Sequence, residues 1–173
     1  KAGARLVQLR EPHMPPDEFE DYARLIAGLC HHHGAQLLLN AEPESVSRCD
    51  ADGVHLNGKR LAQYSSRPLD DHYWVAASCH NAEELRQAEH LGADFAVLSP
   101  VAPTSSHPGA APLGWEAFSR LCAGVNLPVY ALGGMRAQDL ARARQAGAQG
   151  LAMVSQIWDA NSIEQAVTAL ASN

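Results

Sequence analysis

Short apolar runs alternate with helical patterns along most of the chain. Seven runs have the length and aliphatic content of buried strands, and apolar residues at helical spacing follow most of them. The predicted strands are 5–10, 35–40, 52–56, 74–79, 94–100, 128–134 and 150–155. The predicted helices are 15–34, 81–92, 113–124, 136–147 and 162–172, with a short helix or turn at 42–49 and a loop with at most a short helix at 58–70. Repeated strand–helix units predict an α/β fold with a parallel sheet.

Two architectures accommodate seven parallel strands. A TIM (β/α)8 barrel has eight strands and usually takes about 200 residues or more, whereas this chain has 173. An open doubly wound sheet is the alternative, but it would leave two strand edges exposed. We therefore favour the barrel, with seven βα units visible and the first strand lying before Lys1. Residues 1–173 then form a single barrel domain, which we expect to be part of a longer chain.

Composition and charge narrow the class of protein. The formal net charge of -6 argues against a general nucleic-acid surface. No apolar run approaches the roughly 18 residues of a membrane helix, and no signal-peptide pattern opens the chain. The four cysteines show no metal-binding spacing and are interpreted as reduced thiols. We expect a cytoplasmic protein that binds neither nucleic acid nor membrane.

The first predicted strand carries polar residues on one face. Gln8 and Arg10 alternate with Val7 and Leu9, and side chains two apart in a strand share a face. An unpaired charge on an inward face is costly. Arg10 therefore either pairs with a carboxylate or lines a site that receives an anion.

The last two predicted strands end in residues suited to phosphate. Barrel sites form at the carboxyl ends of strands, and phosphate commonly binds after the last two. Gly133 and Gly134 end one of them and Ser155 the other. Paired glycines let backbone amides approach an anion, although a turn before a helix would also favour glycine. We expect phosphate binding here.

Polar residues also follow the other predicted strands. A single one is weak evidence, since His55, for example, could equally be a core histidine. Six polar residues at five strand ends together exceed what turns require, and they are Arg10, Asn40, His55, Ser78, His80 and Ser99.

The segment 100–114 is longer than a minimal strand–helix turn and is rich in Pro, Gly, Ser and Thr. Long loops in compact domains often cover ligands. Thr104 and Ser106 offer hydroxyl groups, and His107 offers an imidazole. The alternative is a solvated loop without a ligand.

In their order, these motifs resemble those of the thiamine-phosphate synthases and their TenI-like relatives. The matching stretches are VQLRE, LLLN, DGVHL, ASCH, LGADFAVLSPVAPT, YALGGM and GAQGLAMVS. The resemblance covers nearly the whole chain, and in the family the glutamine–arginine strand is the second of the barrel. Such domains also occur fused behind a Nudix hydrolase domain, and a chain beginning at Lys1 fits such a piece.

The resemblance implies a transferase that joins a hydroxymethylpyrimidine pyrophosphate to a thiazole phosphate, with magnesium on two aspartates. This sequence departs from that pattern. The two aspartate positions hold Ala41 and Arg60, and Pro12, Glu42 and His107 stand where the family has basic residues. Because hard cations need oxygen ligands, we expect no metal site and no cofactor.

The resemblance also implies which residues hold phosphate groups. These are Gln8, Arg10, Asn40, Ser78, Thr104, Gly133, Gly134 and Ser155, to which the loop adds Ser106. Arg10, Ser78 and His107 are the catalytic candidates, and Arg60 with His107 could replace the metal. The catalytic histidine of the TenI-like tautomerases aligns with Pro100.

Three functions stay open at this point. The first is a divergent transferase of thiamine biosynthesis or salvage that binds a phosphorylated thiazole or pyrimidine with a degenerate magnesium site. The second is a metal-free thiazole phosphate isomerase (tautomerase). The third is a non-catalytic binding or regulatory module fused to a Nudix hydrolase. The expected partners are a small phosphorylated heterocycle and either a second copy of the chain or a fused hydrolase domain.

Overall fold

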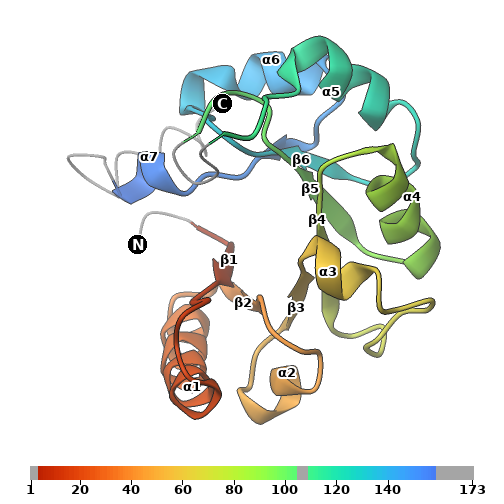
Figure 1. Ribbon diagram of the computed structural model, residues 1–173. Helices are drawn as coiled ribbons and strands as arrows, with labels where there is room; N and C mark the ends of the chain where they lie inside the picture. The colour runs from red at the N-terminus through yellow and green to blue at the C-terminus, as the bar shows by residue number, and fades with distance from the viewer. Residues whose placement is uncertain (1–3, 105–108, 159–173) are drawn as a thin grey trace.

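The computed structural model describes residues 4–104 and 109–158. Its seven strands are all parallel and pair in chain order, and the sheet curls as in a TIM barrel (Figure 1). The strands are β1 (Leu6–Leu9), β2 (Gln36–Leu39), β3 (Gly53–Leu56), β4 (Trp74–Cys79), β5 (Phe95–Leu98), β6 (Val129–Ala131) and β7 (Gly150–Leu151). The predicted barrel class and its strand–helix alternation are confirmed.

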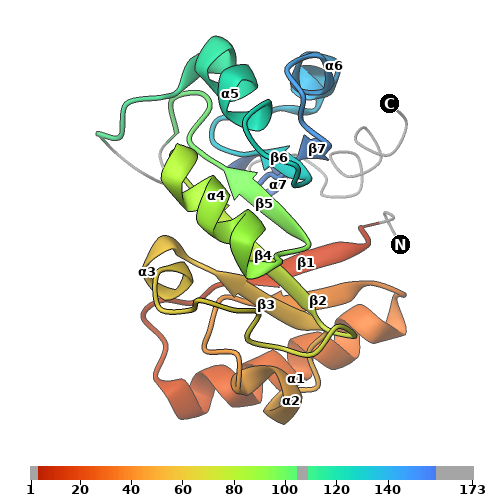
Figure 2. The ribbon, with the colours of Figure 1, turned by 90° about the vertical axis from the view of Figure 1, so that its right-hand side faces the viewer.

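The helices lie outside the curled sheet (Figures 1 and 2). They are α1 (Pro16–His32), α2 (Ser45–Arg48), α3 (Gly58–Leu61), α4 (Ala82–Leu91), α5 (Gly114–Cys122), α6 (Leu140–Gln145) and α7 (Ser155–Trp158), with a 3-10 turn at Ala137–Asp139 before α6. Local chemistry fixes several ends. The Asn81 side chain accepts bonds from the first amides of α4, and Gly92 ends that helix in a left-handed conformation. None of the described helices is long and apolar enough to cross a membrane.

Alternation along the strands divides the apolar residues into two clusters. The larger cluster fills the space between sheet and helices and includes Leu9, Leu39 and Phe118. The smaller cluster lies inside the curl and includes Leu38 and Phe95. Residues two apart therefore reach the same layer, and the inward face can be followed along each strand to its end.

The chain differs from the predicted elements most clearly after β6. The strand predicted at 150–155 ends at Leu151, and Ser155 begins the short helix α7. Among the described strands β7 pairs with β6 alone. It therefore has inter-strand hydrogen bonds on one side only, which favours a short strand. The predicted helix 162–172 lies outside the described residues.

Candidate functional site

The carboxyl ends of the strands meet at one edge of the sheet, as parallel pairing requires. Gln8 pairs in register with the interior residue Leu38, so Gln8 also faces inward. Continuing the alternation along each strand shows which residues near its carboxyl end face inward. Each of the first five strands has a polar residue at such a position. These residues are Arg10, Asn40, Asn57, Ser78 and Ser99. The edge formed by the carboxyl ends of all the strands and the turns that follow them is here called the carboxyl edge.

Arg10 lies exposed at this edge, directly after β1. The amide of Asn40 donates to the carbonyl of Leu9 at 2.9 Å, which places Asn40 beside Arg10. Within residues 4–104 and 109–158 the Arg10 guanidinium forms neither an ion pair nor a hydrogen bond. A carboxylate partner is therefore not found in the described part of the chain. Its role as an anion ligand stays a prediction.

Arg60 approaches the carboxyl edge from α3. Asn57 caps this helix by accepting from the Arg60 amide at 3.0 Å. The guanidinium then donates from Nε to Glu42 Oε1 at 2.7 Å and from Nη1 to Asn40 Oδ1 at 3.2 Å. About a quarter of the Arg60 side chain is exposed (23 %), and Nη2 has no hydrogen-bond partner among the described residues. The helix cap and these two contacts hold the Arg60 guanidinium in place, and some of its N–H donors stay available.

The same residues match magnesium poorly. Magnesium in proteins needs oxygen ligands in near-octahedral geometry. Ala41 offers no side-chain oxygen, and the Glu42 and Asn40 oxygens already accept from a permanent cation. A divalent ion placed between them would be repelled by the Arg60 guanidinium. In the described part of the chain no three His, Cys, Asp or Glu side chains group closely enough to hold a metal ion.

The side chain of Ser78 contacts a buried histidine on the neighbouring strand β3. His55 Nε2 lies 2.8 Å from Ser78 Oγ, and the imidazole packs edge-on against Phe95. Burial lowers the pKa of His55 to about 4, so the ring is neutral near pH 7. A neutral ring that donates from Nε2 leaves the Ser78 hydroxyl proton free to point at a ligand. His55 is thus both a core residue and the partner of a candidate site residue.

His80 directly follows β4, two residues after Ser78. Its Nδ1 lies 2.9 Å from Glu84 Oε2, and the same oxygen accepts from the His80 amide at 2.6 Å. The four-residue spacing of His80 and Glu84 is a sequence signal for such a pair. The pairing of Glu42 with Arg60 has no such signal, because 18 residues separate them.

The Gly133–Gly134 turn follows β6 with φ of +95° and +66°. Cβ atoms here would lie 2.7 Å from Pro100 Cα and 2.5 Å from the Pro103 carbonyl oxygen. Both glycines are therefore required by the packing of the loop after β5, which also donates from the Ala102 amide to the Gly133 carbonyl at 3.1 Å.

The backbone amides of this turn are a second feature relevant to ligand binding. Among the described residues, the backbone amides of Gly133, Gly134 and Met135 have no hydrogen-bond partner. The neighbouring strand β7, which pairs with β6, leads to the start of α7. Consecutive free amides at such a turn are typical anion ligands.

The remaining predicted site residues divide into two groups. Thr104 is partly exposed at the end of the loop after β5, and Ser155 begins α7. Ser106 and His107 lie outside the described residues.

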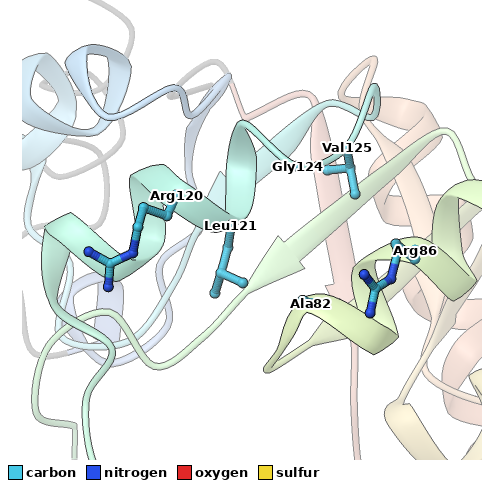
Figure 3. A pocket seen from close by; sticks show the side chains of 6 residues that line it. All are labelled: Ala82, Arg86, Arg120, Leu121, Gly124 and Val125. Carbon is cyan, nitrogen blue, oxygen red and sulfur yellow. The ribbon is translucent and has the colours of Figure 1, made fainter.

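A separate small pocket lies on the outer, helical side of the molecule, between α4 and α5 (Figure 3). Its lining includes Arg86 and Arg120, with Leu121 between them. Arg120 is paired with Glu116 on its own helix. None of the residues lining this pocket belongs to the carboxyl edge.

Comparison with known proteins agrees with this geometry. Residues 1–157 match the family model described as thiamine monophosphate synthase. The chain is 36 % identical over 155 residues to a putative thiamine-phosphate synthase 2 of Aquifex aeolicus, covering 90 % of this chain and 83 % of that protein. It is 34 % identical over 157 residues to a putative thiamine-phosphate synthase of Geobacter sulfurreducens, covering 90 % and 74 %.

Solved structures show the same fold. A thiamine phosphate pyrophosphorylase from Pyrococcus furiosus superposes with a TM-score of 0.81 at 24 % identity, covering 99 % of this chain and 83 % of that one. On the family model and these relatives, the chain belongs to the thiamine monophosphate synthase family.

Proposed function

We propose that this protein binds a phosphorylated thiazole or pyrimidine of thiamine metabolism at the carboxyl edge of its barrel. The observation that carries the proposal is a run of three backbone amides, Gly133 to Met135, that have no hydrogen-bond partner among the described residues. They follow β6, the strand that pairs with β7. Gly133 and Met135 are buried, and buried amides seldom stay unpaired without a ligand or water. Family membership supplies the class of ligand.

The edge divides into two anion subsites in this proposal. The amides of Gly133, Gly134 and Met135, with Ser155, hold a monophosphate. Arg10, Gln8 and Arg60 meet a second anionic group on the opposite side of the mouth, and Ser78 donates to the ligand between them. Thr104 contributes a hydroxyl group from the loop after β5.

For a transferase, the second subsite has a defined task. When the pyrimidine methylene carbon loses its pyrophosphate, the C–O bond breaks and its electron pair leaves with the pyrophosphate. The thiazole nitrogen supplies the pair for the new C–N bond. Fixed positive charge at the second subsite favours this departure, and the hydroxyl of Ser78 can donate to the leaving oxygen.

A second candidate is a metal-free isomerase or a binding module on the same site. The Arg60–Glu42 ion pair favours it, because these residues match the family's metal poorly. A module fused to a hydrolase domain would use the same monophosphate subsite without turnover.

The test is calorimetry with thiazole phosphate, followed by an assay of thiamine phosphate formation from both substrates. We expect thiazole phosphate to bind. Formation of thiamine phosphate identifies the transferase, and binding without product identifies the second candidate. Absence of thiazole phosphate binding would contradict the proposed site.

A further inference from the structure

We infer that the Arg60 guanidinium, fixed by Glu42 and Asn40, takes the place of a divalent cation, so that the second subsite binds diphosphate groups without metal. This inference rests on the proposed function for the class of ligand, but it concerns a different subsite and is tested separately. It also predicts that magnesium neither binds at this edge nor assists the ligand.

The Arg60 cation is held in place before any ligand arrives. The Arg60 amide is engaged by Asn57 at the start of α3, and the guanidinium contacts Glu42 and Asn40 from the adjoining strand end. A planar guanidinium offers five N–H donors in a fixed arrangement. Nε and Nη1 use two of them, so up to three are left to bind phosphate oxygens.

The charged side chains around Arg60 leave net positive charge at this part of the edge. Glu42 neutralises part of the Arg60 charge, while Arg10, on the neighbouring strand end, has no carboxylate partner among the described residues. Asn40 lies next to Arg10, because its backbone amide donates a hydrogen bond to the Leu9 carbonyl, and its side chain also accepts from Arg60. The two arginines thus lie on either side of one asparagine and leave net positive charge at this part of the edge. A diphosphate suits that arrangement better than a metal ion does.

The first experiment titrates the protein with Mn²⁺ alone and follows the free-ion signal by electron paramagnetic resonance. We expect no binding to the wild-type protein. The double variant Ala41→Asp/Arg60→Asp supplies carboxylates at this edge and is expected to bind Mn²⁺. Stoichiometric Mn²⁺ binding to the wild type that the Glu42→Gln substitution weakens would overturn the inference.

The second experiment measures pyrophosphate binding by calorimetry in the presence of EDTA. We expect binding, and we expect Arg60→Ala to weaken it about 10- to 100-fold, the effect of losing charge-assisted hydrogen bonds. Arg86→Ala removes the same charge from the helical side and should leave the affinity unchanged. Glu42→Gln keeps an oxygen acceptor but removes the competing charge, and should tighten binding about threefold.

The outcomes separate this inference from the proposed function. Equal affinities for Arg60→Ala and Arg86→Ala, or pyrophosphate binding that requires magnesium, would overturn it even if thiazole phosphate binds. Circular dichroism checks that each variant folds, and Arg60→Gln replaces Arg60→Ala if the latter does not.

Discussion

The two ends of the sheet differ in how far their polar groups are paired by hydrogen bonds. At the amino ends of the strands, Asp94 Oδ2 accepts from the Val75 amide at 2.7 Å and from Arg67 Nη2 at 2.8 Å. Asp52 Oδ2 similarly accepts from the Leu37 amide at 2.7 Å and lies 2.9 Å from His31 Nε2. These pairs, here called the amino edge, connect neighbouring strands. One atom is an exception, since Arg67 Nε is buried without a hydrogen-bond partner.

At the carboxyl edge, in contrast, Arg10 and the amides of Gly133 to Met135 have no partner within the described parts of the chain. The same strands in the same register form both edges, so strand pairing alone does not explain the difference. Buried polar groups are normally hydrogen-bonded, so the buried amides left without a partner at the carboxyl edge need a separate explanation. The amino edge therefore connects the strands of the barrel to one another, and the proposed ligand would account for the unpaired donors at the carboxyl edge.

The largest expected effect is on stability at the amino edge. Asp94→Ala should lower the free energy of unfolding by about 3 kcal/mol, because it leaves Arg67 and the Val75 amide without their acceptor. Asp71→Ala is the matched control, since that exposed carboxylate lies 3.8 Å from Arg67 Nε, and it should cost less than about 0.5 kcal/mol. Urea denaturation measures both. Similar losses from the two variants would remove the structural role given to Asp94.

The second effect is a pH dependence beneath the carboxyl edge. The pKa of His55 is lowered from 6.5 to about 4 in the folded protein by burial. The unfolded chain therefore binds the extra proton first, and stability present above about pH 6.5 is lost as the pH falls toward 4. Between pH 7 and pH 5 this group should account for about 2 kcal/mol. His55→Gln should flatten the stability profile by that amount, and an unchanged slope would contradict the assigned burial.

The third effect compares two glycines of positive φ. Gly92 has φ of +79° and open space where a Cβ would lie, whereas a Cβ at Gly133 would meet Pro100. Gly133→Ala should therefore cost about 1–2 kcal/mol more than Gly92→Ala in thermal or urea unfolding. Equal costs would show that the loop after β5 yields easily at this point.

The smallest effect on stability is expected at Arg10. Arg10→Ala should change the free energy of unfolding by less than about 0.5 kcal/mol, as for other exposed positions. It should nevertheless weaken pyrophosphate binding about tenfold and leave thiazole phosphate binding nearly unchanged. Calorimetry with both ligands distinguishes this from uniform weakening, which would argue against two subsites.

Much of the fold follows from local patterns in the sequence. The apolar run 74–79 coincides with β4, and Asn81 caps α4 as its position predicts. The end of β7 could not be predicted in the same way, because the sequence from 150 to 155 is apolar enough for a strand while pairing partners decide where it stops.

The candidate site was only partly predictable, for a similar reason. Gln8, Arg10 and Asn40 follow from alternation and strand ends, which are local features. The ion pair of Glu42 with Arg60 and the contact of His55 with Ser78 join different strand ends. The requirement for glycine at Gly133 and Gly134 likewise comes from a loop that is distant in sequence.

The most direct test of the account is a phosphate titration followed by amide NMR. Inorganic phosphate should shift the amide resonances of Gly133, Gly134 and Met135, while those of Leu37 and Val75 at the amino edge stay in place. If these three amides do not respond, and shifts gather instead around Arg86 and Arg120, the carboxyl edge is not the anion site.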